Sequence, residues 1–112
     1  MRLKLFWKDE NNNKFCIAIL SKEINEYILE IQEKELKKAI QNGCIGIGEI
    51  NFLKCKYTSK ELFPFFKSRI PNENHPNIEK ILKKLGLEKY NDMELLKITK
   101  GELQTDRYIV EE

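Results

Sequence analysis

The chain has 112 residues, of which 41% are hydrophobic and 34% are charged, and its formal net charge is +2. This length and apolar content fit one folded domain and exclude both a two-domain enzyme and a disordered tail. The near balance of charge argues against a dedicated nucleic-acid or membrane-surface module that binds by charge alone, so any basic site has to be local.

The N-terminal third has the pattern of β-strands. Arg2 to Lys8 is rich in aromatic and aliphatic side chains, and the polar run 9–14 has the composition of a hairpin loop. A second, almost wholly apolar strand is predicted over Phe15 to Leu20, and a third over Tyr27 to Ile31. Because the connections are too short for crossover helices, these strands are expected to form an antiparallel meander.

The hydrophobic period changes to that of a helix after the third strand. Glu33 to Gln41 carries apolar residues at helical spacing, and Asn42-Gly43 closes the segment like a left-handed helix cap. The glycines of the segment 43–48 indicate either a bend or a close approach of the backbone to another segment. We expect another strand over Phe52 to Tyr57.

The second half of the chain is mainly helical. Pro64 is expected in the first turn of a short helix that extends to Ile70, where Pro71 forces the chain to be extended. A longer helix is predicted from Pro76, at its first position, to Leu85. Its apolar residues recur at i, i+3, i+4 and i+7, and Gly86 follows its end.

The C-terminal segment supplies a last helix and a closing strand. Asn91, with Glu94 three residues later, resembles a capping box for a helix that contains Leu95 and Leu96 and stops at Lys100-Gly101. Tyr108 to Val110 is expected to form the closing strand. The fold class is therefore α+β: a small antiparallel sheet, built on an N-terminal meander, with C-terminal helices packed on it, as a single domain over residues 1–112.

The sequence offers little for catalysis. The single histidine, His75, precedes a helix-starting proline and is expected to be a solvent-facing loop residue. The glycine-rich segment 43–48 matches neither phosphate-loop spacing, and we find no metal-ligand spacing. We therefore predict no catalytic, cofactor-binding or metal-binding residues and a protein that is not an enzyme. We interpret the three cysteines as small buried hydrophobes: Cys16, Cys44 and Cys55.

The location of the protein follows from the same patterns. No run of about 18 apolar residues could span a membrane, and the N-terminus has neither a long apolar block nor a cleavage site. We expect a cytoplasmic protein that does not bind membranes.

A cluster of phenylalanines is the most informative local feature. Three rings in four positions of a short helix are hard to bury together, so we expect one ring to be exposed beside an arginine, as at an interface hot spot. A core corner is the alternative. The predicted partner-binding residues are Phe63, Phe65, Phe66 and Arg69.

Basic residues around these rings support a second alternative. Single-stranded nucleic acid binds where bases stack on rings between cationic side chains. The relevant cations are Lys54, Lys56, Lys60, Lys67 and Arg69. By contrast, we expect Lys80, Lys83 and Lys84 to form the solvated face of their helix.

Several of these segments together resemble a known family. The run from Leu62 to Pro71, with its FF-x-x-x-x-P segment, the helix Ile78 to Gly86, the stretch Glu94 to Lys97 and Gly101 are similar to the N-terminal subdomain of HipA-type serine/threonine kinases. The strands Phe15 to Leu20 and Tyr27 to Ile31 resemble the opening sheet of that subdomain. The resemblance covers roughly residues 1 to 110, but Lys100-Gly101-Glu102 stands where the family often has Gly-Gly-Asp.

The resemblance implies a binding function. In that family the subdomain packs on the kinase core and carries no catalytic residues, and the chain lacks the motif set of a phosphoryl-transferring core. It is thus similar to the small HipS proteins of three-part HipBST toxin–antitoxin systems, which restrain a shortened HipA-like kinase. A HipA-like kinase is the expected partner, with a helix-turn-helix repressor as an indirect one.

Other functions stay open at this point. Similar N-terminal segments precede HIRAN domains, which bind DNA ends, so a nucleic-acid accessory module is one alternative. A small inhibitor of a host or phage defence enzyme is another. No cofactor is expected in any of these cases.

Overall fold

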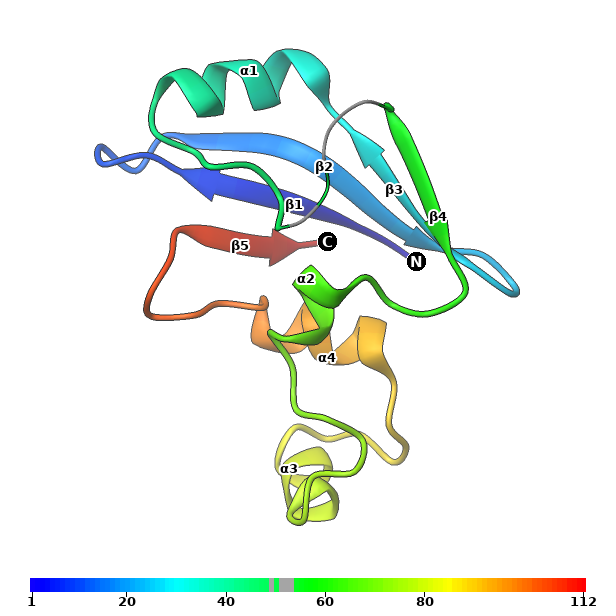
Figure 1. The fold of residues 1–112 in the computed structure, drawn as a ribbon. Helices are drawn as coiled ribbons and strands as arrows, with labels where there is room; N and C mark the ends of the chain where they lie inside the picture. The colour runs from blue at the N-terminus through cyan, green and yellow to red at the C-terminus, as the bar shows by residue number, and fades with distance from the viewer. Residues whose placement is uncertain (49, 51–53) are drawn as a thin grey trace.

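The computed structural model describes residues 1–48, 50 and 54–112. The described residues form a five-stranded antiparallel sheet in the order β4-β3-β2-β1-β5, together with four helices (Figure 1). The α+β prediction is confirmed. The elements are β1 (Arg2–Lys8), β2 (Lys14–Lys22), β3 (Tyr27–Ile31), α1 (Glu33–Gln41), β4 (Lys56–Ser59), α2 (Pro64–Lys67), α3 (Ile78–Lys84), α4 (Asp92–Thr99) and β5 (Tyr108–Glu111).

The three N-terminal strands form the predicted antiparallel meander. In register, Leu3 lies opposite Leu20, which lies opposite Leu29, so three fully buried leucines line up across β1, β2 and β3 on one face. Side chains alternate between the two faces of a strand, and this face is the core face. A bulge shifts the β1–β2 register between Leu5 and Phe6.

The closing strand β5 returns to the far edge of the sheet. It pairs antiparallel with β1, with Trp7 opposite Tyr108 and Leu5 opposite Val110. The two ends of the chain therefore meet in neighbouring strands. Figure 1 shows α1 next to β2, α2 and α4 next to β5, and α3 farthest from the sheet.

The fourth strand begins later than predicted. β4 spans Lys56–Ser59 and pairs with β3, and of the expected range 52–57 it includes Lys56 and Tyr57. Residues 52 and 53 lie outside the described residues. The bend over 43–48 is present, because Gly43, Gly46 and Gly48 all have positive φ angles.

The helices differ from the prediction mainly at their ends. α2 begins at Pro64 as expected but ends at Lys67 and does not reach Ile70, because Ser68 already closes its single turn. α3 begins at Ile78, so the prediction of Pro76 as its first residue was wrong. Pro76 instead lies in a preceding turn, in which the Ile78 amide donates to the His75 carbonyl at 3.0 Å.

The cap of α4 is confirmed. The Asn91 side-chain oxygen accepts a hydrogen bond from the Glu94 amide at 3.1 Å, and Lys100 ends the helix in the left-handed conformation. Every buried helical residue belongs to one hydrophobic cluster on the core face: Leu36, Ala39, Phe66, Leu82, Met93, Leu95 and Leu96.

The cysteine prediction holds in part. Cys44 is buried and Cys16 is half-buried, but Cys55 is exposed, so its assignment as a buried hydrophobe was wrong. The Cys55 thiol donates a hydrogen bond to the Glu33 carboxylate at 2.7 Å, and this bond raises the pKa of the thiol. A polar partner at the start of α1 thus holds this side chain at the surface.

Candidate functional site

The phenylalanine cluster lies largely inside the core. Phe66 is 0% exposed and Phe63 is buried, whereas Phe65 is half-buried. Phe63 precedes α2 with an extended backbone (φ −58°, ψ 140°), so its ring does not follow the helical period. Two of the three rings are therefore buried, as the core-corner alternative has it, while Phe65 keeps part of its surface beside Arg69 but is not fully exposed.

Arg69 is also buried, and both terminal nitrogens of its guanidinium are hydrogen-bonded. The guanidinium pairs with Asp106 at 2.6 Å and donates to the Gly101 carbonyl at 3.0 Å. It also lies 4.3 Å from the Phe65 ring centroid and 5.0 Å from that of Tyr108. Arg69 thus joins α2 to the segment before β5, and of the four predicted partner-binding residues Phe65 keeps the most exposed surface. Partner contact by these residues stays a prediction.

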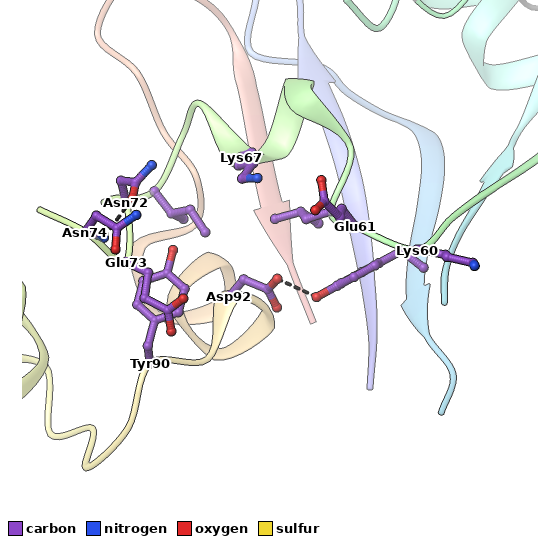
Figure 2. Close-up of a pocket in the computed structure, with 11 residues that line it drawn as sticks. Lys60, Glu61, Lys67, Asn72, Glu73, Asn74, Tyr90 and Asp92 are labelled. Atoms are coloured by element: carbon purple, nitrogen blue, oxygen red, sulfur yellow. Dashed lines mark hydrogen bonds between the residues drawn. The ribbon is translucent and has the colours of Figure 1, made fainter. Parts of the chain in front are cut away.

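We call the contact of Arg69 with Gly101 and Asp106 the joint. A cavity of about 310 Å³ opens beside the joint, and Figure 2 shows the residues around the cavity. It lies between the start of β3, the segment before α2, and the loop that leads toward α3. Its walls mix rings, carboxylates, amides and two lysines: Tyr27, Lys60, Glu61, Leu62, Lys67, Ile70, Asn72, Glu73, Asn74, Tyr90 and Asp92.

Tyr27 and Asp92 form the polar wall of the cavity. The Tyr27 hydroxyl donates to Asp92 Oδ2 at 2.5 Å, as the dashed line in Figure 2 marks. Burial, reinforced by Asp92, raises the pKa of the Tyr27 phenol far above its ordinary value, so the phenol stays protonated as a donor. Asp92 Oδ1 is shielded from solvent and has no hydrogen-bond partner among the described residues.

Tyr90 fixes the opposite wall. Its hydroxyl donates to the Pro71 carbonyl at 2.7 Å and so ties the stretch after α3 to the loop before it. Burial and the nearby Asp92 and Glu73 raise the pKa of this phenol as well. Two neutral phenols, three carboxylates and two ammonium groups can hold a polar or charged segment of a partner.

Of the other sequence candidates, Lys60 and Lys67 line this cavity, whereas His75 and the lysines of α3 do not. His75 is exposed in the loop before α3, where its Nδ1 accepts a hydrogen bond from the Asn77 amide at 3.0 Å, and the solvent-facing prediction is confirmed. Lys80, Lys83 and Lys84 are exposed, as predicted. Within residues 1–48, 50 and 54–112, no group of three or more potential metal ligands was found, and no helix is long and apolar enough to cross a membrane.

Sequence reasoning missed the pairing that defines the cavity. Tyr27 and Asp92 are 65 positions apart, and no local pattern connects them. One partial signal existed, because the capping pair Asn91 and Glu94 places Asp92 in the first helical turn. The position of that turn against β3 depends on long-range packing.

Comparisons with known proteins identify no relative. No family model, curated protein or solved structure matches the chain.

Proposed function

We propose that the protein is a non-catalytic binding protein of the cytoplasm that docks on a HipA-like serine/threonine kinase and restrains it. One observation carries the proposal: three of the segments that resemble the HipA N-terminal subdomain, residues 62–71, residues 94–97 and Gly101, meet at a single joint. Arg69, from the first segment, donates to the carbonyl of Gly101, from the last. A Cβ placed on Gly101 would lie 3.4 Å from Leu96, in the middle segment, and 3.7 Å from Arg69.

The joint makes the resemblance physically coherent. Phe66, Leu95 and Leu96 are fully buried around it, so the shared residue types would specify the same packing of the short helix on the last helix. Packing of this kind supports the proposal that the chain has a fold like that of the HipA subdomain, and this proposed likeness motivates the choice of partner. The docking contacts themselves have to come from the surface.

The cavity of Figure 2 is the contact region that this proposal favours. Leu62, Lys67 and Ile70, all from the resembling segment, line it next to the joint. A partner segment seated there would contact the phenols and carboxylates described above. Inhibition requires only that the bound protein cover the nucleotide or substrate site of the kinase, or hold it open.

Co-expression with a kinase encoded by a neighbouring gene tests the proposal. We expect the two proteins to copurify and kinase toxicity to fall when both are made. Lys67→Glu at the cavity should weaken the complex at least tenfold, whereas Lys37→Glu, on the exposed face of α1, should leave it unchanged. Absence of a complex, with no relief of toxicity, would remove the proposal and leave inhibition of an unrelated host or phage enzyme to be tested.

The structure does not favour the nucleic-acid alternative as it arose from the sequence. That alternative depended on stacking rings, but Phe63 and Phe66 are buried, and Arg69 already pairs with Asp106. We therefore do not propose it as a second function.

A further inference from the structure

The sheet has a second face, opposite the core, that carries a different set of side chains. Lys4, Ile19, Glu30 and Lys56 lie in register across β1, β2, β3 and β4 on this face. We call it the outer face, and by the alternation of strand residues it includes every second residue of each strand, with a shift at the bulge in β2 between Cys16 and Ala18.

The helices nearest the sheet pack on its core face, and α3 lies farther from the sheet (Figure 1). The buried residues of all four helices belong to the core cluster, whereas Ile28 and Ile109, which are also buried, lie outside that cluster. In register, Ile28 is flanked by Ser21 and Thr58, and Ile109 lies opposite Phe6. These two isoleucines therefore lie on the outer face, apart from the core cluster.

The outer face carries an excess of positive charge. Its cations are Arg2, Lys4, Lys8, Lys14 and Lys56. Its anions are Glu30 and Glu111, and Glu111 is already paired with Lys14. The face therefore has a formal charge of +3, more than the +2 of the whole chain, so the other residues together carry −1.

This concentration of charge fits an anionic partner, and the aromatic content indicates which kind. Single-stranded nucleic acid requires open rings for stacking. Phe6, the aromatic residue of the outer face, is half-buried, and the Lys14 ammonium lies 4.6 Å above its ring centroid. Cations around a half-buried ring that a lysine already overlies suit the carboxylates of a protein better than the bases of a nucleic acid.

We propose that the outer face binds an acidic, Asp- and Glu-rich protein surface. In the cell this surface would belong to the kinase, so the choice of partner rests on the proposed function. The recognition itself depends on charge complementarity between the face and a cluster of carboxylates.

A triple variant with a matched control tests the inference. Arg2→Gln, Lys4→Gln and Lys56→Gln remove three charges from the outer face, and Lys80→Gln, Lys83→Gln and Lys84→Gln remove three from α3, far from the sheet. We expect the first variant to bind the kinase at least tenfold more weakly and with a smaller salt dependence, and the second to stay within twofold of the unchanged protein. Thermal unfolding verifies that both variants fold. If the unchanged protein binds the kinase and the two variants behave alike, this inference falls while the proposed function stands.

A second measurement does not need the kinase. At low salt, hexaglutamate titrated into the full chain should shift the amide resonances of Lys4, Ile19 and Lys56, and the outer-face variant should lose these shifts. Shifts spread equally over α3, or no shifts, would overturn the inference. Tighter binding of a single-stranded or duplex oligonucleotide through the same lysines would overturn it in favour of nucleic acid.

Discussion

The sheet and the α3 region are built in different ways. In the sheet, buried leucines of three strands line up in register, and β1 and β5 join the two ends of the chain. Of the seven residues of α3, Leu82 is the buried one. Figure 1 shows this helix apart from the sheet. Pairing between residues far apart in sequence holds the first region, whereas α3 contributes one buried residue to the core.

This contrast predicts that the two regions differ in stability. Residues far apart in sequence share the core, so the sheet and its joint with α2 and α4 should unfold cooperatively. The α3 region is tied back through the Tyr90 hydroxyl and the Pro71 carbonyl, and it should open at a lower free energy. Matched substitutions in the two regions test whether their stabilities differ in this way.

The largest effect is expected for Phe66→Ala. Phe66 is fully buried in the joint, so truncation removes apolar contacts and leaves a cavity, at a cost of about 3–5 kcal/mol. Leu82→Ala, in α3, should cost about 2 kcal/mol, the lower end for leucine, because Leu82 keeps some exposed surface and its helix lies away from the sheet. Chemical denaturation measures both free energies of unfolding, and equal losses would contradict the contrast.

Arg69→Met is expected to have the next largest effect. It preserves most of the side-chain volume but leaves Asp106 and the Gly101 carbonyl without their donor. Loss of one partner of a buried ion pair costs about 3–5 kcal/mol, and because the Asp106 side chain is 26% exposed we expect about 2–3 kcal/mol. Denaturation gives the global value. Amides of α3 that exchange through local opening, at free energies below the global value, should keep their exchange rates. Faster local exchange in α3 would show that the joint also supports this helix.

A pair of glycine substitutions separates backbone strain from packing. Gly86, after α3, has φ +78° with nothing within 4 Å of an added Cβ, whereas Gly101 has φ +55° with Val110 Cγ2 at 3.3 Å. Gly86→Ala should cost about 1 kcal/mol for the left-handed backbone alone. Gly101→Ala should cost about 2 kcal/mol, since a neighbour has to move as well. Thermal denaturation measures both, and a larger loss at Gly86 would reverse the comparison.

The sequence predicted the sheet better than the site, for physical reasons. Alternation and apolar runs identified β1, β2 and β3 because these patterns are local. For α3, the spacing of Ile78, Ile81, Leu82 and Leu85 identified the apolar face of the helix. It did not indicate how much protein would cover that face, and three of these residues are only half-buried.

The candidate site depended on contacts that no local pattern encodes. The Phe63 ring leaves the helical period because its backbone is extended, and the partner of Arg69 is 37 residues away. An arginine beside phenylalanines has the composition of an interface hot spot and equally that of a buried ion pair with stacked rings. The position of Asp106 decides between them, and that position follows from the pairing of β5 with β1.

The smallest effect is expected in the loop between β1 and β2, where one carboxylate should make the free energy of unfolding depend on pH. Asp9 closes the β1–β2 hairpin: its Oδ1 accepts from the amides of Asn11 and Asn13, and its Oδ2 from the Asn13 side chain at 2.9 Å. These bonds, the Asn13 side chain first, hold the pKa of Asp9 below its ordinary value of 3.8. Because the folded pKa is the lower one, the stabilisation is complete well above pH 3.8 and is lost as the pH falls through the lowered value.

The Asp9→Asn variant isolates this contribution, because the side-chain amide that replaces the carboxylate cannot titrate. The difference in unfolding free energy between the unchanged protein and this variant should be largest near pH 7 and shrink below about pH 4. Chemical denaturation across this pH range measures it. A difference that stays constant from pH 7 down to about pH 2 would show that the Asp9 carboxylate does not stabilise the hairpin through its charge.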